Sequence, residues 1–391
     1  MMDLSPIAQE IAELREKGRY RCLWRVSTPQ DEVISIEGRR LLNFSSNNYL
    51  GLANHPEVVE AFAEYAGKYG VGSGASRLIS GNMEIHAELE EAFARFKGTE
   101  ACLTFSSGYL ANLGILDTLG SPEATIFSDE LNHASIVDGC RLSRARVEVY
   151  RHADMGHLED LLKASQAGRK IIVTDGLFSM GGDIAPLPDL VKLKEKHGAI
   201  LVVDDAHATG TLPPQGRGSA DYFGLAGEID IQMGTFSKAL GTYGAFMCAS
   251  RTIVDYFINK CRTFIFNTGL PPAIAGATLK SVELLSLHPE RLASLMENGE
   301  IFRREMDVRG RKISSRTAIV PIPIGRDEDT MAVSRRLYDR GLFIHGIRPP
   351  TVPEGKGQLR LTLMATHTAD MVKTAARRID ESLKELGIEP Y

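Results

Sequence analysis

Between about residues 100 and 250, short apolar runs alternate with stretches whose apolar residues recur at helical spacing. Most of these runs are continuously apolar, which is typical of strands buried on both faces of a sheet. Helix-like segments such as 157–168 and 187–198 lie between most of them, and both end at a glycine. The pattern predicts an α/β fold with a mostly parallel, seven-stranded sheet wrapped by helices. The expected strands are 101–105, 124–129, 147–152, 170–176, 199–205, 230–236 and 244–250.

The pattern changes on both sides of this region. Upstream, 56–70 and 84–98 carry apolar residues at helical spacing. Downstream of about residue 285, three strand-like runs precede a closing helix at 368–386, which indicates a smaller α+β unit. Those runs are 318–325, 343–348 and 358–365. The expected organisation is therefore an N-terminal segment (1–45), a large domain (46–285) and a small C-terminal α+β domain (286–391).

Composition narrows the class of protein without naming a function. The chain has 391 residues, 43% of them hydrophobic and 24% charged, which suffices for a large core. A net charge of −5 gives no basic field for nucleic acid or an anionic membrane. Five scattered cysteines without a CxxC argue against a disulfide framework and fit a reducing cytosol. With no leader-like segment, bilayer-length apolar run or metal-binding cluster, we expect a cytoplasmic protein without a metal.

The residues that follow each expected strand are the first candidates for chemistry, because ligands of open α/β sheets bind beyond the carboxyl ends of the strands. The turn SSGYLANL (106–113) leaves backbone N–H groups free at a helix start, a possible seat for phosphate. Asp204, Asp205 and His207 follow the most apolar strand, and His133 follows an earlier one. A carboxylate buried there needs a partner. That partner is either a protonated ring nitrogen of a cofactor or the amides of a helix start, and the sequence leaves both open.

The stretch GTFSKALGTYG (234–244) places Lys238 among small residues. An amine in such a place is either an exposed charge or a nucleophile. Thr235 and Ser237 beside it could donate hydroxyls to a phosphate, and Ser179 lies in the turn after another strand. Each feature alone is weak evidence. Together, a lysine, a carboxylate, histidines and an anion seat match the needs of pyridoxal 5'-phosphate (PLP).

A glycine-rich stretch, YGVGSGASRLISGN (69–82), needs a different interpretation. It follows a helical segment, whereas the dinucleotide-binding fingerprint requires a preceding strand. We therefore interpret it as a loop in which backbone segments approach closely.

Several stretches together resemble the α-oxoamine synthases, PLP enzymes of fold type I that condense an amino acid with an acyl thioester and release carbon dioxide. The resemblance covers nearly the whole chain and implies a homodimer with active sites between subunits. The run IRPPTVPEGKGQLRLTL (347–363) is most similar to members that join L-alanine to a pimeloyl thioester, on CoA or acyl carrier protein, in biotin biosynthesis. The alternative is glycine with acetyl-CoA, or another acyl donor. The matching stretches are FSSNNYLGL (44–52), GSGASRLISGN (72–82), SDELNHASIVDG (128–139), DGLFSMGGDIAPL (175–187), VDDAHATGTL (203–212) and TFSKALG (235–241).

The resemblance implies a role toward PLP for each matching residue. Lys238 would carry the cofactor as a Schiff base and act as the base in catalysis. Asp204 would pair with the pyridinium nitrogen, and His133 would stack on the ring. Ser179 and His207 would lie near the phenolic oxygen. The cofactor phosphate would be held by Gly108, Tyr109 and Thr235.

The resemblance also implies substrate contacts. Arg360 would bind the carboxylate of the amino acid, with Asn47 nearby. Arg21 and Thr351 match positions that contact the acyl substrate, although GRYRCLWR also offers Arg19 and Arg25 in place of Arg21. Two positions depart from the common pattern: Gly181 stands where FSMDGD is usual, which alters a turn, and Ala75 replaces the frequent glycine of GSGGSR.

Overall fold

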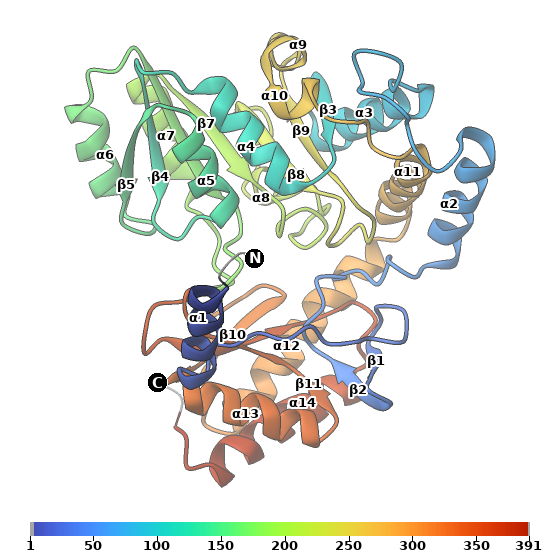
Figure 1. Cartoon of the computed structure of the whole chain (residues 1–391), viewed down its shortest axis with the longest axis vertical. Coiled ribbons are helices and arrows are strands. Elements are labelled where there is room, and N and C mark those ends of the chain that lie inside the picture. The colour runs from blue at the N-terminus through green and yellow to red at the C-terminus, as the bar shows by residue number, and fades with distance from the viewer. Residues whose placement is uncertain (1–3, 390–391) are drawn as a thin grey trace. The chain divides into compact units, whose positions relative to one another are not determined.

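A computed structural model describes residues 4–389 of the chain, and Figure 1 shows the arrangement of its elements. The chain divides into two compact units. The sheet unit contains Asn47–Ser179 and Asp183–Ser294. The terminal unit contains the described chain up to Ser46, the short segment Met180–Gly182 and the chain from Leu295 onward. The boundary between Ser294 and Leu295 falls within α12 (Pro289–Val308), and the described residues up to Ser46 group with the C-terminal part of the chain.

The sheet unit is built on a seven-stranded sheet with the strand order β3-β9-β8-β7-β6-β4-β5. The pairs β4–β5, β4–β6, β6–β7 and β7–β8 are parallel, and β9 runs antiparallel to both of its neighbours, β3 and β8. All seven expected strands are present, so the predicted α/β class and mostly parallel sheet are confirmed. The strands are β3 (Ala101–Phe105), β4 (Ala124–Asp129), β5 (Arg146–Tyr150), β6 (Arg169–Asp175), β7 (Ala199–Asp204), β8 (Ile231–Thr235) and β9 (Ala245–Ala249).

Helices cover both faces of this sheet, which explains why its strands are apolar without alternation. In β6, Ile171 and Val173 join one buried cluster with residues of α4, α5 and α9, whereas Ile172 joins a second cluster with residues of α6 and α7. The helix α11 packs against α2 and α3. The helices of this unit are α2 (Pro56–Tyr69), α3 (Glu84–Lys97), α4 (Gly108–Leu119), α5 (Ala134–Leu142), α6 (Met155–Ala164), α7 (Leu187–His197), α8 (Ser219–Tyr222), α9 (Arg251–Lys260), α10 (Arg262–Ile265) and α11 (Pro272–Leu287).

The helical segments 157–168 and 187–198 were both predicted to end at a glycine, and this prediction is wrong for the first of them. The helix α7 does end at Gly198, which adopts a left-handed conformation with φ 61°. The helix α6, in contrast, ends before Gly168, because Ser165 is already extended (φ −78°, ψ 128°). The Ser165 hydroxyl accepts a hydrogen bond from the backbone N–H of Ala167, so a serine turn ends this helix.

The terminal unit contains two three-stranded sheets and flanking helices. In one sheet, β1 (Val33–Ile36) pairs antiparallel with β2 (Arg39–Asn43), and β2 pairs in parallel with β11 (Leu342–Phe343). In the other, the central strand β13 (Gly357–Thr362) pairs antiparallel with β10 (Ile319–Gly325) and β12 (His345–Ile347). The single strand expected at 343–348 is therefore split between two sheets. The helices are α1 (Ser5–Glu16), α12, α13 (Asp327–Asp339) and α14 (Ala369–Glu385).

Over residues 4–389, none of the helices combines the length and the apolar character needed to cross a membrane.

Candidate functional site

The ends of β8 and α4 meet in a notch that suits a phosphate group. A Cβ on Gly108, the first residue of α4, would lie 2.5 Å from Cγ2 of Thr235, the last residue of β8. Only glycine therefore lets the helix begin this close to the strand. The first N–H groups of a helix lack intrahelical partners and attract anions. The Thr235 hydroxyl is buried and has no hydrogen-bond partner among the described residues, which leaves it available to a bound group.

Asp204 ends β7 as a buried carboxylate with 4% of its surface exposed. Its Oδ2 accepts a hydrogen bond from Nδ2 of Asn112 at 2.7 Å, and its Oδ1 accepts one from the backbone N–H of Ala206 at 2.8 Å. Each carboxylate oxygen can accept more than one hydrogen bond. Asp204 thus retains capacity for a further donor, such as a protonated ring nitrogen.

The neighbouring Asp205 belongs to a different environment. Its Oδ2 lies 2.9 Å from Nζ of Lys97, and both side chains are fully buried. The backbone N–H and the hydroxyl of Ser219 also donate to this carboxylate. Asp205 therefore forms a buried ion pair with Lys97 inside the sheet unit. The described hydrogen bonds of Asp204, in contrast, come from the side-chain amide of Asn112 and the backbone amide of Ala206.

His133 caps the N-terminus of α5. Its Nδ1 accepts a hydrogen bond from the backbone N–H of Ser135 at 3.2 Å and lies 2.7 Å from the hydroxyl of the same serine. Its own backbone N–H donates to Oδ2 of Asp175 at 2.9 Å. Desolvation lowers the pKa of His133, and so does the positive charge of Lys238, whereas the negative charge of Asp204 opposes this shift. The imidazole is thus biased toward its neutral form.

Lys238 lies in the turn after β8, where its carbonyl accepts a hydrogen bond from the backbone N–H of Gly241 at 3.0 Å. Burial and the charge of Asp204 raise the pKa of Asp175 well above its usual range, and the charge of Lys238 acts against this shift. Lys238 is therefore within electrostatic range of both Asp175 and His133. Residues after β4, β6, β7 and β8 meet at one edge of the sheet, which we call the strand-end site.

His207 and Ser179 lie in the loops that follow β7 and β6. Nδ1 of His207 is 2.8 Å from the hydroxyl of the buried Tyr49, which also donates to Oδ1 of Asn47 at 3.4 Å. Ser179 is half-buried. Tyr109 is 43% exposed, and its hydroxyl is hydrogen-bonded to Asp138, which raises the pKa of the phenol. Tyr109 can therefore serve an anion at the start of α4 through its backbone N–H.

A histidine outside the predicted set supports the loop after β6. His152 lies 3.0 Å from Oδ1 of Asp129 through Nδ1 and 2.8 Å from Oδ2 of Asp183 through Nε2. Hydrogen bonds to these two carboxylates raise the pKa of His152 to about 10. A charged imidazole thus ties the end of β4 to the residue that closes this loop.

The predicted acyl-binding residues lie in the terminal unit. Nη2 of Arg21 donates to the carbonyl of Pro349 at 3.5 Å, and the backbone N–H of Thr351 donates to the carbonyl of Arg348 at 3.2 Å. One loop therefore brings Arg21 and Thr351 together. The rival Arg19 already pairs with Asp327 and Glu354, at 3.3 and 2.8 Å.

The terminal unit also contains Arg360 and Trp24, an aromatic residue close to Arg21 in sequence. Arg360 lies in β13 and is 9% exposed. Trp24 stacks on Tyr338 with ring centroids 5.4 Å apart. Leu23 is 98% exposed.

Sequence reasoning missed several residues of these sites. Asn112, Ser135, Asp175 and Tyr49 all lie in stretches that had been singled out, but only the tertiary contacts give them partners. Arg348 precedes a Pro-Pro pair, is 7% exposed and donates from Nη2 to the carbonyl of Tyr20 at 3.0 Å. Its Nε is buried without a hydrogen-bond partner in the described chain. Burial, together with the charge of Arg21, lowers the pKa of Arg348.

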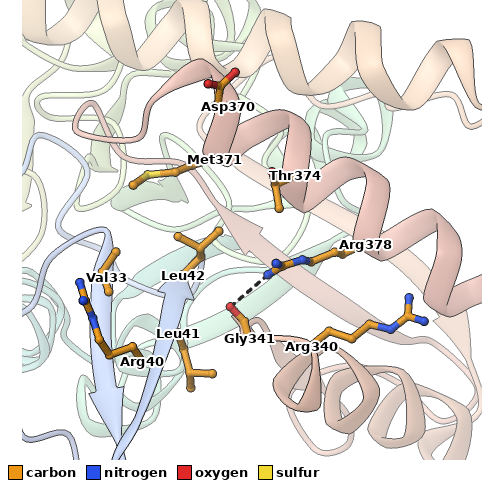
Figure 2. Close-up of a pocket in the computed structure, with 10 residues that line it drawn as sticks. All are labelled: Val33, Arg40, Leu41, Leu42, Arg340, Gly341, Asp370, Met371, Thr374 and Arg378. Carbon is orange, nitrogen blue, oxygen red and sulfur yellow. Dashed lines mark hydrogen bonds between the residues drawn. The ribbon is translucent and has the colours of Figure 1, made fainter.

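A pocket of about 530 Å³ lies elsewhere, in the terminal unit, between the strands β1 and β2, the turn before β11 and the helix α14 (Figure 2). Three arginines line it: Arg40, Arg340 and Arg378. Nη1 of Arg378 donates to the carbonyl of Gly341 at 3.4 Å, and Arg340 is paired with Glu381 and Glu385. Its lining residues, as far as the chain is described, include none of the predicted site residues, so the strand-end site remains the candidate for catalysis.

Comparison with known proteins gives consistent results. The sequence model of the family described as aminotransferase class I and II matches residues 39–379. The 8-amino-7-oxononanoate synthase of Geobacter sulfurreducens is 51% identical over 387 residues, covering 98% of this chain and 99% of the relative. That of Thermoanaerobacter pseudethanolicus is 45% identical over 389 residues, covering 99% and 98%.

Solved structures agree in fold. A serine palmitoyltransferase from S. paucimobilis with bound PLP superposes with a TM-score of 0.93 at 31% identity, covering 98% of each chain. An 8-amino-7-oxononanoate synthase from Francisella tularensis has a TM-score of 0.78 at 29% identity, covering 89% of this chain and 99% of that one. These similarities confirm fold type I and the expected PLP dependence.

Proposed function

The chain belongs to the α-oxoamine synthases, PLP-dependent members of the class I and II aminotransferase family, and we propose that it joins L-alanine to a pimeloyl thioester. The products would be 8-amino-7-oxononanoate, carbon dioxide and the free thiol. The identity of 45–51% over nearly the whole chain to synthases of that name carries this proposal. The alternative is glycine with acetyl-CoA, or another pair of substrates. A serine palmitoyltransferase shares the fold at 31% identity, so the fold alone does not select the substrates.

The strand-end site suits the binding of PLP. The Thr235 hydroxyl, which has no hydrogen-bond partner within residues 4–389, and the N-terminus of α4 would hold the phosphate, and the space beside Gly108 accommodates no side chain. Asp204 would keep the ring nitrogen protonated, and a neutral His133 would stack on the ring. When bound, PLP supplies an electron sink that lowers the cost of negative charge on the α-carbon of the amino acid.

Lys238 would hold the cofactor through its side-chain amine. The same amine, when it is not bound to the cofactor, would take the α-proton of alanine and later return a proton to the product. A lysine suits this task because its pKa falls when nearby charges or burial disfavour the ammonium form. Small residues flank Lys238, which lets a backbone or a ligand approach its side chain closely.

The terminal unit would supply the contacts to substrate carboxylates. Arg360 would bind the carboxylate of alanine bidentately, which fixes the α-hydrogen for removal. Arg21 and Arg348 would receive the distal carboxylate of a free pimeloyl chain, and burial together with the charge of Arg21 lowers the pKa of Arg348. Each methylene of that chain buried in the complex would contribute about 0.8 kcal/mol, which an acetyl group cannot supply.

We further propose that the protein works as a cytoplasmic homodimer. Large apolar side chains are exposed in the glycine-rich loop and in the segment after α10, which is unusual for a surface that stays in water. Val71 is 83% exposed, Ile79 81% and Phe266 73%. Light scattering at micromolar concentration should report a dimer, and a fully active monomer would refute this part of the proposal.

The substrate proposal is tested by measuring thiol release over a matrix of substrates. L-alanine, glycine and L-serine would each be combined with pimeloyl-CoA, pimeloyl-acyl carrier protein, acetyl-CoA and palmitoyl-CoA. We expect alanine with a pimeloyl thioester to give the highest kcat/KM. If glycine with acetyl-CoA is faster, the substrate assignment fails while the family assignment stands.

A further inference from the structure

A chain of hydrogen bonds connects Asp204 with His133 through two residues that have no role so far. Nδ2 of Asn112 donates to Oδ2 of Asp204 at 2.7 Å and to the hydroxyl of Ser135 at 2.9 Å. That hydroxyl lies 2.7 Å from Nδ1 of His133. We propose that Asn112 and Ser135 are positioning residues that couple the tautomer of His133 to the charge of Asp204.

The direction of the first hydrogen bonds follows from the charge of Asp204. An ionised carboxylate can only accept hydrogen bonds, so Asn112 must turn its NH2 group toward it. The opposite orientation would place the amide oxygen of Asn112 against a carboxylate oxygen. With the NH2 group fixed, one hydrogen goes to Asp204 and the other to Ser135. Asn112 is 2% exposed, so bulk water cannot replace either partner.

The second step fixes the hydroxyl of Ser135. Its oxygen receives the hydrogen of Asn112, and its own hydrogen is therefore free to point at Nδ1 of His133. The backbone N–H of Ser135 also points at this nitrogen, at 3.2 Å. Two donors directed at Nδ1 leave no place for a proton there. The proton of the neutral ring is then on Nε2.

The charges around His133 agree with a neutral ring. The charges of Lys238 and Asp204 shift the pKa of the His133 ring in opposite directions. Asp175 accepts a hydrogen bond from the backbone N–H of His133. Burial and the charge of Lys238 lower the pKa of His133. If PLP binds as proposed above, a neutral imidazole over the cofactor ring would leave Asp204 as the group that sets the charge of the ring nitrogen. This last consequence rests on the proposed function, whereas the coupling itself does not.

The tautomer can be measured by nitrogen NMR on the full-length protein labelled with 15N-histidine, without PLP and with PLP. The resonance of His133 is assigned by its loss in His133→Gln. We expect the wild type to carry its proton on Nε2. In Ser135→Ala, the fraction with a proton on Nδ1 should rise about tenfold, the change expected from the loss of one hydrogen bond. Asp204→Asn should act in the same direction, because Asn112 is then free to turn over.

Matched variants separate this role from a purely structural one. Ser143 lies at the other end of α5 and donates its hydroxyl to the carbonyl of Cys140 at 2.7 Å, so Ser143→Ala loses a similar bond. This control should leave the tautomer unchanged. Ser135→Thr keeps the hydroxyl and should restore the wild-type tautomer even if Ser135→Ala is poorly folded.

Two results would overturn the coupling. One is a wild-type His133 that carries its proton on Nδ1. The other is a folded Ser135→Ala or Asp204→Asn protein whose tautomer ratio equals that of the wild type. Neither measurement uses a substrate, so a failure of the thiol-release assay would contradict the proposed function and leave the coupling intact.

Discussion

Replacing Asp204 with asparagine isolates the charge of this residue from its shape. The amide has nearly the same volume, and its oxygen can still accept the backbone N–H of Ala206, which donates at 2.8 Å in the wild type. Its NH2 group would face Asn112, whose own amide must turn over to present oxygen. Because no charge then has to be buried, we expect the variant to fold and its melting temperature to stay close to that of the wild type.

The loss of activity expected for Asp204→Asn follows from the charged hydrogen bond that the Asp204 carboxylate would make to the cofactor ring. A hydrogen bond to a charged group is worth about 1.5–3 kcal/mol. Losing about 2–3 kcal/mol from the stabilisation of the transition state lowers kcat/KM by about 30- to 150-fold. The assay is thiol release with L-alanine and pimeloyl-CoA, with PLP occupancy of each sample checked by its absorbance.

The adjacent Asp205 provides a control with the opposite outcome. Asp205→Asn leaves the buried Lys97 without its carboxylate, and breaking such a pair costs about 3–5 kcal/mol of unfolding free energy. We therefore expect Asp205→Asn to reduce stability in urea and Asp204→Asn to reduce turnover. An Asp204→Asn enzyme with bound PLP and activity within a few-fold of the wild type would refute the assigned role.

Three further predictions concern the same unit. Borohydride reduction of the purified enzyme should fix PLP on the peptide containing Lys238, and mapping to another lysine would contradict the assignment. Gly108→Ala should weaken PLP binding at least about fivefold, since overpacking costs about 1–3 kcal/mol and the new methyl would lie 2.5 Å from Thr235; equal dissociation constants by fluorescence titration would count against it. His152 has a folded-state pKa of about 10, above its usual value, so its stabilising effect should be complete below the usual pKa and disappear as pH rises through about 10. Urea midpoints of the wild type and His152→Gln should therefore converge at alkaline pH, and a constant gap would contradict this.

Much of the fold could be predicted because its strands are buried on both faces. A run such as 199–205 is apolar at almost every position, and β7 (Ala199–Asp204) forms within it. A helix end that depends on a side-chain hydrogen bond was harder to predict. The serine turn at Ser165 ends α6 before the glycine that the pattern favoured. The short strands β11 and β12 could not be separated by pattern, because their partners lie far away in sequence.

Some residues of the candidate site could likewise be predicted from the sequence, and others could not. Lys238, Asp204 and Thr235 could be identified because each lies at the end of an apolar strand or just after it. Asn112 and Ser135 could not, since their importance depends on contacts between α4, α5 and the end of β7 that no local pattern records. Residue type alone does not distinguish an asparagine that orients a carboxylate from one that faces water.

The pairing of β2 with β11 has a consequence for how this protein is made. Leu42 and Leu342 are partners in that small sheet, so β2 leaves the ribosome long before the strand that completes its edge. Until then, the hairpin of β1 and β2 presents unpaired backbone groups, which are a template for pairing with other chains. The terminal unit can be completed only after synthesis of the sheet unit has finished. Truncated chains that end near residue 294 should therefore aggregate more readily than chains that also lack the first 46 residues.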